Sequence, residues 1–335
     1  YDLPGILILT LRSSVRPGKQ IIFMSGITKA CCRKSGWGMR IALDATPLAL
    51  RTGGITRYTA ELSAALASEF PEDEYLLVTD QMLTPPAGLL TGRPNLRVVP
   101  PPDNPLRRRW WSLGLAAHLS RTATELFHGT DFAVPYLPLR PSVLTLHDLS
   151  PWMDVEWQGA SGRVRRRTPW LLRSGIATMV ITPTEAIRRD AIEWFGLAPG
   201  RIRAVPLAAS VCFRADAPAP ARRRYFLYAG ALEPRKNIDM LIACWRQLHR
   251  RRPVDLVLAG RRRPDFRLPT AEDGLEWKGE VTDEELARLY AGAAAVVYPS
   301  MYEGFGLPVL EAMQCGALVI ASRVPALSEV AAGAA

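Results

Sequence analysis

One stretch, residues 293–311, constrains the fold of this chain most. Residues 293–299 form a short apolar run, which is typical of a strand buried on both faces of a parallel sheet. Gly304 and Gly306 then allow a tight turn and the close approach of a ligand. Pro308 suits the start of a helix, because its missing N–H would be unbonded there. The stretch predicts strand, loop and helix in an open α/β sheet, whose ligands bind at the carboxyl ends of the strands.

Two glutamates lie in this stretch, and we expect Glu303 on the loop and Glu311 in the opening turn of the helix. Ionised carboxylates only accept hydrogen bonds, which suits paired hydroxyls of a sugar or ribose. The amides at a helix start attract a phosphate. Taken singly, Glu311 could merely complement the helix dipole and Glu303 could be a solvated loop residue. Together with the strand, the turn and the proline, the pair indicates a binding site.

Residues 303–311 resemble the E-x7-E motif of the retaining glycosyltransferases of family 4, which have the GT-B fold. The resemblance implies that Glu303 contacts the transferred sugar and that Glu311 holds the ribose of the nucleotide. It also implies that the donor is bound by the residues of the intervening turn, which are Gly304, Phe305, Gly306 and Leu307.

A second motif, residues 233–237, carries Arg235 and Lys236 between a predicted strand and a predicted helix. These side chains can grip a diphosphate, arginine through its planar fork and lysine as a point charge. Alone, such a pair is more often an exposed basic pair. It resembles the family's Pro-Arg-Lys motif, which implies that both residues bind the donor diphosphate. Lys236 would also stabilise charge on the leaving group during catalysis.

The first half of the chain adds a glycine pair and a histidine. Gly53 and Gly54 do not make a dinucleotide-binding fingerprint, because that motif needs a third glycine. They resemble the family's glycine loop between donor and acceptor, which implies a role in donor binding. His147 follows a predicted strand, where a lone histidine is usually structural or solvent-facing. The resemblance implies that it reaches a hydroxyl of the donor sugar, so the catalytic candidates are His147, Glu303 and Lys236.

Residues 106–113 combine three arginines with two tryptophans at a predicted helix start. Arginines and indole rings suit a bilayer interface or a lipid-linked acceptor. In the alternative interpretation, which we slightly favour, the tryptophans are core residues and the arginines are solvated.

Composition limits the classes of partner. The net charge of +10 favours acidic partners, namely nucleotide phosphates, anionic lipid or nucleic acid. No nucleic-acid-binding signature accompanies the charge, so we expect no nucleic acid partner. No apolar stretch is long enough for a transmembrane helix. The five scattered cysteines indicate a reducing compartment, so we expect a cytoplasmic protein, peripheral at most at the inner face of the membrane.

Two runs of alternating strands and helices predict an α/β protein. We expect residues 1–38 to lie outside the fold, because Met39 directly precedes the first strand. Residues 39–210 would form an N-terminal acceptor-side domain, 211–224 a linker, and 225–335 a C-terminal nucleotide-sugar domain. The family pattern continues beyond residue 335, so we expect this last domain to be incomplete. Predicted strands lie at residues 41–44, 75–79, 96–99, 126–128, 142–146, 178–182, 225–230, 253–260, 275–279, 293–299 and 317–322.

The resemblance implies a GT-B enzyme with two Rossmann-like, doubly wound parallel-sheet domains facing across a cleft. The expected reaction moves a hexose, by resemblance mannose, from a nucleotide diphosphate sugar to a saccharide or polyprenyl-linked acceptor, with retention of configuration. The nucleotide sugar is a substrate, and neither a cofactor nor an essential metal is expected. The alternatives are a sugar-nucleotide 2-epimerase on the same architecture and an inactive remnant.

Overall fold

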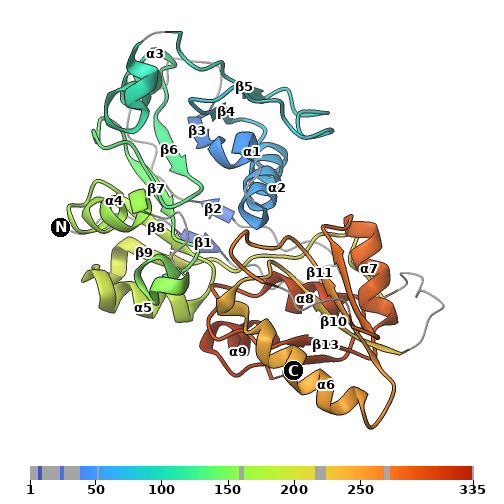
Figure 1. Ribbon diagram of the computed structural model, residues 1–335. Coiled ribbons are helices and arrows are strands. Elements are labelled where there is room, and N and C mark those ends of the chain that lie inside the picture. The colour runs from blue at the N-terminus through green and yellow to red at the C-terminus, as the bar shows by residue number, and fades with distance from the viewer. Residues whose placement is uncertain are drawn as a thin grey trace. The chain divides into compact units, whose positions relative to one another are not determined.

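The computed structural model describes residues 7–9, 23–25, 38–50, 53–103, 105–157, 162–215, 224–267 and 272–333. The chain forms two compact α/β units, each built on its own parallel sheet (Figure 1). Unit 1 comprises Tyr1–His147, Gly162–Thr182 and Ala191–Arg203, and unit 2 comprises Asp148–Ser161, Pro183–Asp190 and Ala204–Ala335. The predicted extension, 1–38, and the predicted linker, 211–224, lie largely outside the described residues. Within the predicted extension, β1 (Leu7–Leu9) pairs antiparallel with β2 (Phe23–Ser25).

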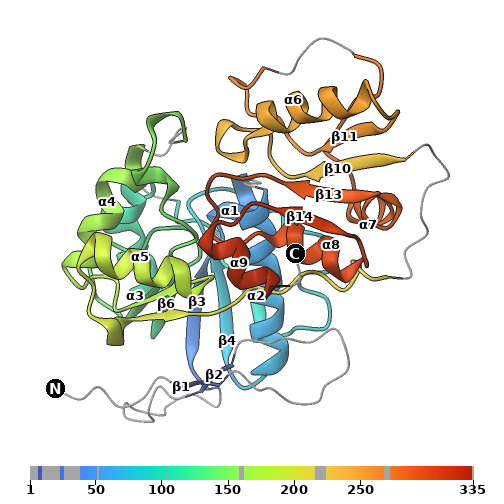
Figure 2. The ribbon, with the colours of Figure 1, turned by 90° about the horizontal axis from the view of Figure 1, so that it is seen from below.

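Unit 1 is built on a seven-stranded sheet in the order β5-β4-β3-β6-β7-β8-β9. Its central strands are short and almost wholly buried, as expected where helices cover both faces. Helix α2 covers one face and α5 the other (Figure 2). The strands are β3 (Arg40–Asp44), β4 (Glu74–Val78), β5 (Leu96–Val98), β6 (Leu126–Gly129), β7 (Ser142–Thr145), β8 (Met179–Thr182) and β9 (Ile202–Ala204).

The helices of unit 1 follow the apolar spacing of the sequence. On α2 the buried positions include Leu62 and Leu66, four residues apart on one face, and they pack against β3 and β4 residues such as Leu43 and Leu77. The helices that lie wholly in unit 1 are α1 (Thr46–Leu50), α2 (Gly54–Glu69), α3 (Leu115–Arg121) and α4 (Gly162–Arg173), with short turns η1 (Pro105–Arg109), η2 (Trp110–Gly114) and η5 (Pro199–Arg201). Helix α5 (Glu185–Phe195) begins in unit 2 and ends in unit 1, and the short turns η3 (Ser150–Trp152) and η4 (Val155–Trp157) belong to unit 2.

Unit 2 contains a five-stranded parallel sheet in the order β12-β11-β10-β13-β14. Helix α6 covers one face, and α7 and α8 cover the other (Figure 1). The strands are β10 (Tyr225–Ala229), β11 (Asp255–Ala259), β12 (Leu275–Gly279), β13 (Ala295–Tyr298) and β14 (Val319–Ala321). The helices are η6 (Pro234–Lys236), α6 (Ile238–His249), α7 (Asp283–Gly292), α8 (Leu307–Gln314) and α9 (Pro325–Ala331).

Each sheet has a point at which the strand order reverses. In unit 1 this point lies between β3 and β6, and in unit 2 it lies between β10 and β13. The chain leaves the two strands toward opposite sides of the sheet, so a crevice opens outside their carboxyl ends, where ligands of open α/β sheets bind. The fold therefore marks two places to search for a site, one in each unit.

The predicted fold class, two doubly wound parallel α/β sheets, is confirmed. All eleven predicted strands are present, with ends that differ by at most two residues. The short strands β1, β2 and β9 were not predicted. Among the described residues, no helix combines the length and the apolar character needed to cross a bilayer.

The arginine- and tryptophan-containing motif of unit 1 does not present its indole rings to solvent. Trp110 and Trp111 are 3% and 9% exposed, because η2 turns both rings into the core. The interpretation of these tryptophans as core residues is confirmed, and a bilayer contact through them is wrong.

Candidate active site

The two motifs of unit 2 lie at the point where its strand order reverses. The turn η6, with Arg235 and Lys236, follows β10, and the loop with Glu303 follows β13. Because β10 and β13 are parallel neighbours, their carboxyl ends deliver the motifs to the same edge of the sheet. Hydrogen bonds to two backbone carbonyls join the motifs: Met301 N–H donates to the Arg235 carbonyl (2.9 Å), and Arg235 Nη1 donates to the Tyr302 carbonyl (2.8 Å).

Glu303 is the centre of a buried charge cluster. Lys236 Nζ donates to Glu303 Oε1 at 2.5 Å, and Arg235 Nη1 donates to Glu303 Oε2 at 3.3 Å. Arg235 Nη2 reaches Glu233 Oε1 at 2.8 Å. Lys236 and Glu303 are each only 6% exposed. The structure thus brings three of the predicted site residues, Arg235, Lys236 and Glu303, into direct contact.

The charges of the cluster set its protonation. Burial alone would raise the pKa of Glu303, but the nearby charges of Lys236 and Arg235 hold it below its ordinary value. Burial lowers the pKa of Lys236, against the opposing pull of Glu303. For Arg235, burial acts to lower the pKa, yet the carboxylates of Glu303, Asp148 and Glu233 raise it. Glu303 is therefore an ionised acceptor beside a permanently charged guanidinium.

Two stacked tyrosines form a wall of the cluster that the sequence analysis missed. The rings of Tyr228 and Tyr298 lie 5.7 Å apart with a 12° interplanar angle. Lys236 Nζ donates to the Tyr298 hydroxyl at 3.1 Å and lies 5.3 Å from the centroid of that ring. Burial holds the pKa of both phenols well above its ordinary value, so both stay protonated. Tyr298 is the last residue of β13, and in the sequence it is hidden in the apolar run.

The turn after Glu303 depends on glycine. Gly306 has φ 99° and ψ 48° and precedes α8 as its N-cap. A Cβ atom at Gly306 would lie 2.3 Å from Leu327 Cδ2. Gly304 and Phe305 are buried in the same turn, and the Gly304 carbonyl accepts a hydrogen bond from Thr184 Oγ1 at 3.0 Å. Leu307 is half-buried as the first residue of the helix. Their predicted roles in donor binding stay predictions.

Replacing Gly306 with alanine should lower the stability of unit 2. A left-handed conformation costs a residue with a Cβ about 1–3 kcal/mol, and the clash with Leu327 adds to this. We expect a melting transition several degrees lower, measured by differential scanning calorimetry. Gly200→Ala is the control, because Gly200 has open space around its Cβ position and no positive φ. Equal losses in the two variants would show that the turn imposes no such constraint.

Glu311 is the fifth residue of α8, not a residue of its opening turn as predicted. The reason is local. Because Gly306 is the N-cap, residues 307–310 form the first turn of α8, and Glu311 begins the second. The side chain is 4% exposed, and Oε2 accepts a hydrogen bond from the Tyr290 hydroxyl of α7 at 3.2 Å. The helix-start proline is confirmed, since Pro308 lies in the first turn.

A cavity of about 590 Å³ lies beside η6 within unit 2. Pro234 of η6 and Asp239 of α6 contribute to its wall, together with the loop after β11. Its size falls within the range of small-molecule sites. The lining residues are Glu156, Pro234, Asp239, Arg263, Asp265, Phe266 and Arg267.

The remaining predicted residues, Gly53, Gly54 and His147, belong to unit 1. Gly53 has a positive φ of 68° before α2, whereas Gly54 is already the first residue of that helix. His147 is half-buried, and its Nε2 bonds the Thr130 carbonyl at 2.7 Å. The edge of its ring meets Tyr58 at a centroid distance of 4.9 Å. A structural role thus accounts for these contacts, and the catalytic role of His147 stays a prediction.

A smaller cavity of about 70 Å³ lies at the reversal point of unit 1. Asp44 ends β3, is 2% exposed, and its Oδ1 accepts hydrogen bonds from the backbone N–H and the hydroxyl of Thr46. Burial raises the pKa of Asp44 to about 7. The sequence analysis assigned Asp44 no role. An acidic residue at the end of a predicted buried strand is the signal that could have marked it as a site residue. The cavity is also lined by Trp111, Asp131, Tyr136, Arg163 and Arg167.

No group of three or more metal-ligating side chains occurs in the part of the chain that the structure describes. The side chains gathered at the two reversal points are of the kinds that can bind anions and hydroxyl groups. Buried cations stand beside an acceptor-only carboxylate in unit 2, and carboxylates stand beside aromatic rings in unit 1.

Two family models match the chain. Residues 52–211 match "Glycosyltransferase Family 4", and residues 223–334 match "Glycosyl transferases group 1". The chain belongs to glycosyltransferase family 4. The first match ends at residue 211 and the second begins at residue 223. The second match contains Arg235, Lys236, Glu303 and Glu311.

Curated relatives of this family 4 chain include bacterial mannosyltransferases. The chain is 36% identical over 225 residues to the O-antigen chain mannosyltransferase B of Escherichia coli, covering 61% of this chain and 58% of the relative. It is 32% identical over 176 residues to the MMP alpha-(1->4)-mannosyltransferase of Mycolicibacterium hassiacum, covering 50% of this chain and 40% of the relative. The chain thus spans less than two thirds of the length of these relatives.

Solved structures give this family 4 chain the GT-B fold. The sucrose-phosphate synthase of Thermosynechococcus elongatus superposes with a TM-score of 0.64 at 22% identity, over 86% of this chain and 82% of that one. Anabaena Alr3699/HepE, solved in complex with UDP and glucose, gives a TM-score of 0.58 at 19% identity, over 86% and 81%. At these identities the likeness concerns the fold alone.

Proposed function

We propose that this chain transfers a hexose, with mannose as the first candidate, from a nucleotide diphosphate sugar to a saccharide or polyprenyl-linked acceptor. The named mannosyltransferase relatives support the choice of sugar. The proposed reaction retains the anomeric configuration, as the family resemblance implies, and uses no essential metal. No observation favours an epimerase or an inactive remnant.

The observation that carries the proposal is the buried cluster of Arg235, Lys236 and Glu303. A diphosphate beside η6 would bring acceptor oxygens to Arg235 and Lys236, whose charges act strongly because water is excluded. Both cations would be held in place before the reaction begins. They would therefore stabilise the charge that builds on the leaving diphosphate without reorganising.

The same cluster gives Glu303 a role at the sugar. As an ionised carboxylate it can accept a hydrogen bond from a hydroxyl of the donor hexose. The salt bridges to Arg235 and Lys236 fix its orientation. Glu311 lies on α8, which begins after the turn. We propose that it accepts hydrogen bonds from the ribose hydroxyls, which replace the bond that it accepts from the Tyr290 hydroxyl. The 590 Å³ cavity beside Pro234 offers space next to the proposed diphosphate position.

For the acceptor we propose the cavity at the reversal point of unit 1. Carboxylates at Asp44 and Asp131 can accept bonds from saccharide hydroxyls, and the rings of Trp111 and Tyr136 offer apolar faces to a sugar. Burial raises the pKa of Asp44 to about 7, which would suit a group that takes a proton from an acceptor hydroxyl near neutral pH.

A donor screen tests the proposal. The full chain is incubated with GDP-mannose, GDP-glucose, UDP-glucose and UDP-galactose, together with mannosides as acceptors, and released nucleoside diphosphate is measured. We expect release with GDP-mannose that increases when an acceptor is added, and an α-linked product by NMR. A β-linked product would contradict retention. Absence of release with every donor and acceptor would contradict the proposal as a whole.

A further inference from the structure

Three buried tyrosines in the sheet of unit 2 use their hydroxyls in different ways. Tyr225 and Tyr228, both on β10, donate to backbone carbonyls at 2.7 and 2.9 Å. The hydroxyl of Tyr298, the last residue of β13, instead accepts a hydrogen bond from Lys236 Nζ at 3.1 Å. All three tyrosines are at most 1% exposed. Tyr298 is therefore the one of the three whose hydroxyl contacts a residue of the proposed site.

This contact helps to set the direction in which Lys236 donates. An ammonium group has three N–H donors. Among the described residues they have two acceptors, Glu303 Oε1 at 2.5 Å and the Tyr298 hydroxyl at 3.1 Å. Because the bonds about the nitrogen are tetrahedral, two fixed N–H bonds also fix the direction of the third. Without the Tyr298 hydroxyl the ammonium group could rotate about its bond to Glu303, and the third donor would lose its direction.

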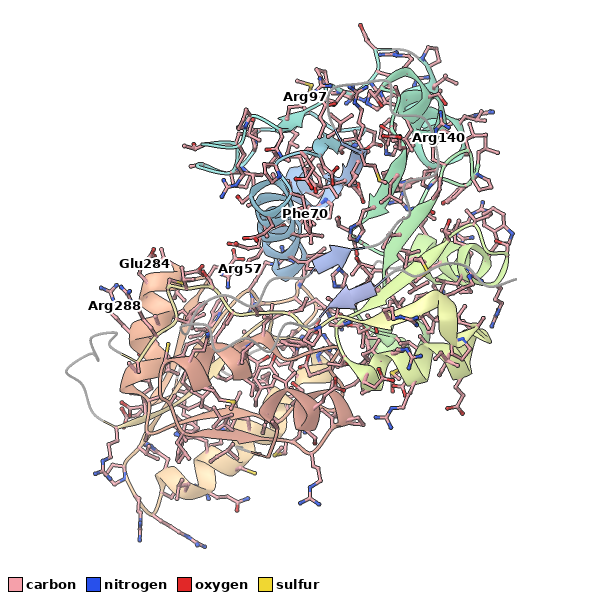
Figure 3. All side chains as sticks on the ribbon, turned by 180° about the vertical axis from the view of Figure 1, so that it is seen from behind. Arg57, Phe70, Arg97, Arg140, Glu284 and Arg288 are labelled. Carbon is pink, nitrogen blue, oxygen red and sulfur yellow. The ribbon has the colours of Figure 1, made fainter. Side chains whose placement is uncertain are left out.

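The ring of Tyr298 is fixed by its neighbours. It stacks on the Tyr228 ring with centroids 5.7 Å apart and an interplanar angle of 12°, and its centroid lies 5.3 Å from Lys236 Nζ. Gly230 leaves room beside the two hydroxyls, because a Cβ atom there would lie 3.1 Å from the Tyr228 oxygen and 3.7 Å from the Tyr298 oxygen. Lys236 is 6% exposed, whereas Arg288 of α7 points into solvent (Figure 3). Protein groups therefore set the direction of the Lys236 amine.

Tyr298 also affects the charge of Lys236. Burial lowers the pKa of Lys236, and the charge of Arg235 lowers it further, whereas Glu303 and Glu233 raise it. These charged groups face the amine from its own turn and from the loop after β13. The Tyr298 phenol stays neutral, since burial holds its pKa well above the ordinary value. A neutral acceptor stabilises the ammonium more than the uncharged amine, so its loss would lower the pKa of Lys236.

We infer that Tyr298 is a positioning residue for the proposed transfer. Together with Glu303, its hydroxyl directs the third N–H of Lys236 toward the donor diphosphate and favours the charged form of the amine. The inference rests on the proposed function, which places the diphosphate at Arg235 and Lys236. Because Tyr298 is 1% exposed, it acts through Lys236 and not by contact with the donor.

NMR of the full chain, with lysine labelled with ¹³C at Cε, tests the inference without a measurement of activity. The chain has five lysines, and the signal of Lys236 is assigned by its loss in Lys236→Arg. Tyr298→Phe keeps the ring, its stack on Tyr228 and its contact with the amine, and removes the hydroxyl alone. We expect the titration midpoint of Lys236 to lie about one pH unit lower in Tyr298→Phe than in the parent.

Tyr225→Phe is the matched control. Tyr225 is also buried and also loses a hydrogen bond, but it is the first residue of β10, whereas the site lies beyond the carboxyl end of that strand. The titration midpoint of Lys236 in this variant should equal that of the parent. The melting temperatures of both variants are measured, and both should remain folded throughout the titration.

Steady-state kinetics with the donor found in the screen give a second readout. Tyr298→Phe should lower kcat about tenfold and change KM by less than about twofold, because the direction of the Lys236 donor matters most when charge builds on the leaving diphosphate. The alkaline limb of the kcat profile should move to lower pH, since Lys236 loses its proton at lower pH in this variant. Tyr225→Phe should keep the kcat, the KM and the alkaline limb of the parent.

Equal midpoints and equal rates in Tyr298→Phe and Tyr225→Phe would overturn the inference and leave the proposed function standing. A lower midpoint with unchanged kcat would also overturn it, because Tyr298 would then affect the charge of Lys236 without positioning it for transfer. Failure of the proposed function gives a different result. The parent itself would release no nucleoside diphosphate in the donor screen, and the inference would fall with it.

Discussion

Replacing Lys236 with alanine should lower kcat by a factor of about 10²–10³, the loss typical when one charge-stabilising donor is removed from a reaction centre. The side chain is buried and bonds Glu303 and Tyr298, so its position is fixed before the substrate arrives. Charge grows on the leaving diphosphate in the transition state, and therefore kcat should fall more than KM rises. Steady-state kinetics with the donor found in the screen measures both.

A matched control separates this effect from the removal of any lysine or arginine in an ion pair. Arg246 of α6 also pairs with a carboxylate, that of Glu272, but both side chains are more than a third exposed. Exposed pairs contribute little, so Arg246→Ala should leave kcat unchanged. Lys236→Ala should also weaken nucleoside diphosphate binding far more than nucleoside binding. Kinetics of Lys236→Ala that match those of Arg246→Ala would remove Lys236 from the site.

Glu303→Gln should slow transfer by at least about tenfold while nucleoside diphosphate binding changes little. The substitution keeps the shape of the side chain and removes a charged acceptor, and a hydrogen bond to a charged group contributes about 1.5–3 kcal/mol. Glu311→Gln should have the reverse effect, since its proposed partner is the ribose: binding weakens and the rate at saturating donor changes less. Isothermal titration with GDP and single-turnover kinetics measure the two quantities separately.

The two glutamate variants also define the result that would contradict the roles assigned to Glu303 and Glu311. If Glu303→Gln abolished nucleotide binding and Glu311→Gln did not, the two roles would be wrongly assigned. Glu303→Gln leaves Lys236 and Arg235 with a neutral partner, so the melting temperature of this variant must be measured beside its kinetics. Because loss of a buried ion-pair partner lowers stability, the assignment requires that the rate falls at a temperature where the variant is still fully folded.

Much of the fold could be predicted because buried parallel strands are short continuous apolar runs. That signal located β13 and the glycine turn after it, and the turn placed Glu303. It missed β9, whose three residues include an arginine and give no apolar run.

The candidate site could be predicted only where a motif carried it. The contact of Lys236 with Glu303 joins residues 67 positions apart, and the order of β10 and β13 in the sheet makes it possible. Tyr298 gave no signal of its own within the apolar run, and Asp44 gave only that of an acidic residue at the end of a buried strand. The role of each depends on what lies beyond its strand. The burial of Trp110 and Trp111 depends on the backbone turn at η2, and the residue types of this segment do not predict that turn.

The central claim is that unit 2 holds a nucleotide through its diphosphate at Arg235 and Lys236. Isothermal titration of the unmodified chain with GDP, GMP and guanosine, and with the uridine series, tests it most directly. We predict that one diphosphate binds at least about 100-fold more tightly than its nucleoside, since two charge-assisted contacts are lost together. Equal affinities for diphosphate and nucleoside, or no binding of either series, would contradict the claim.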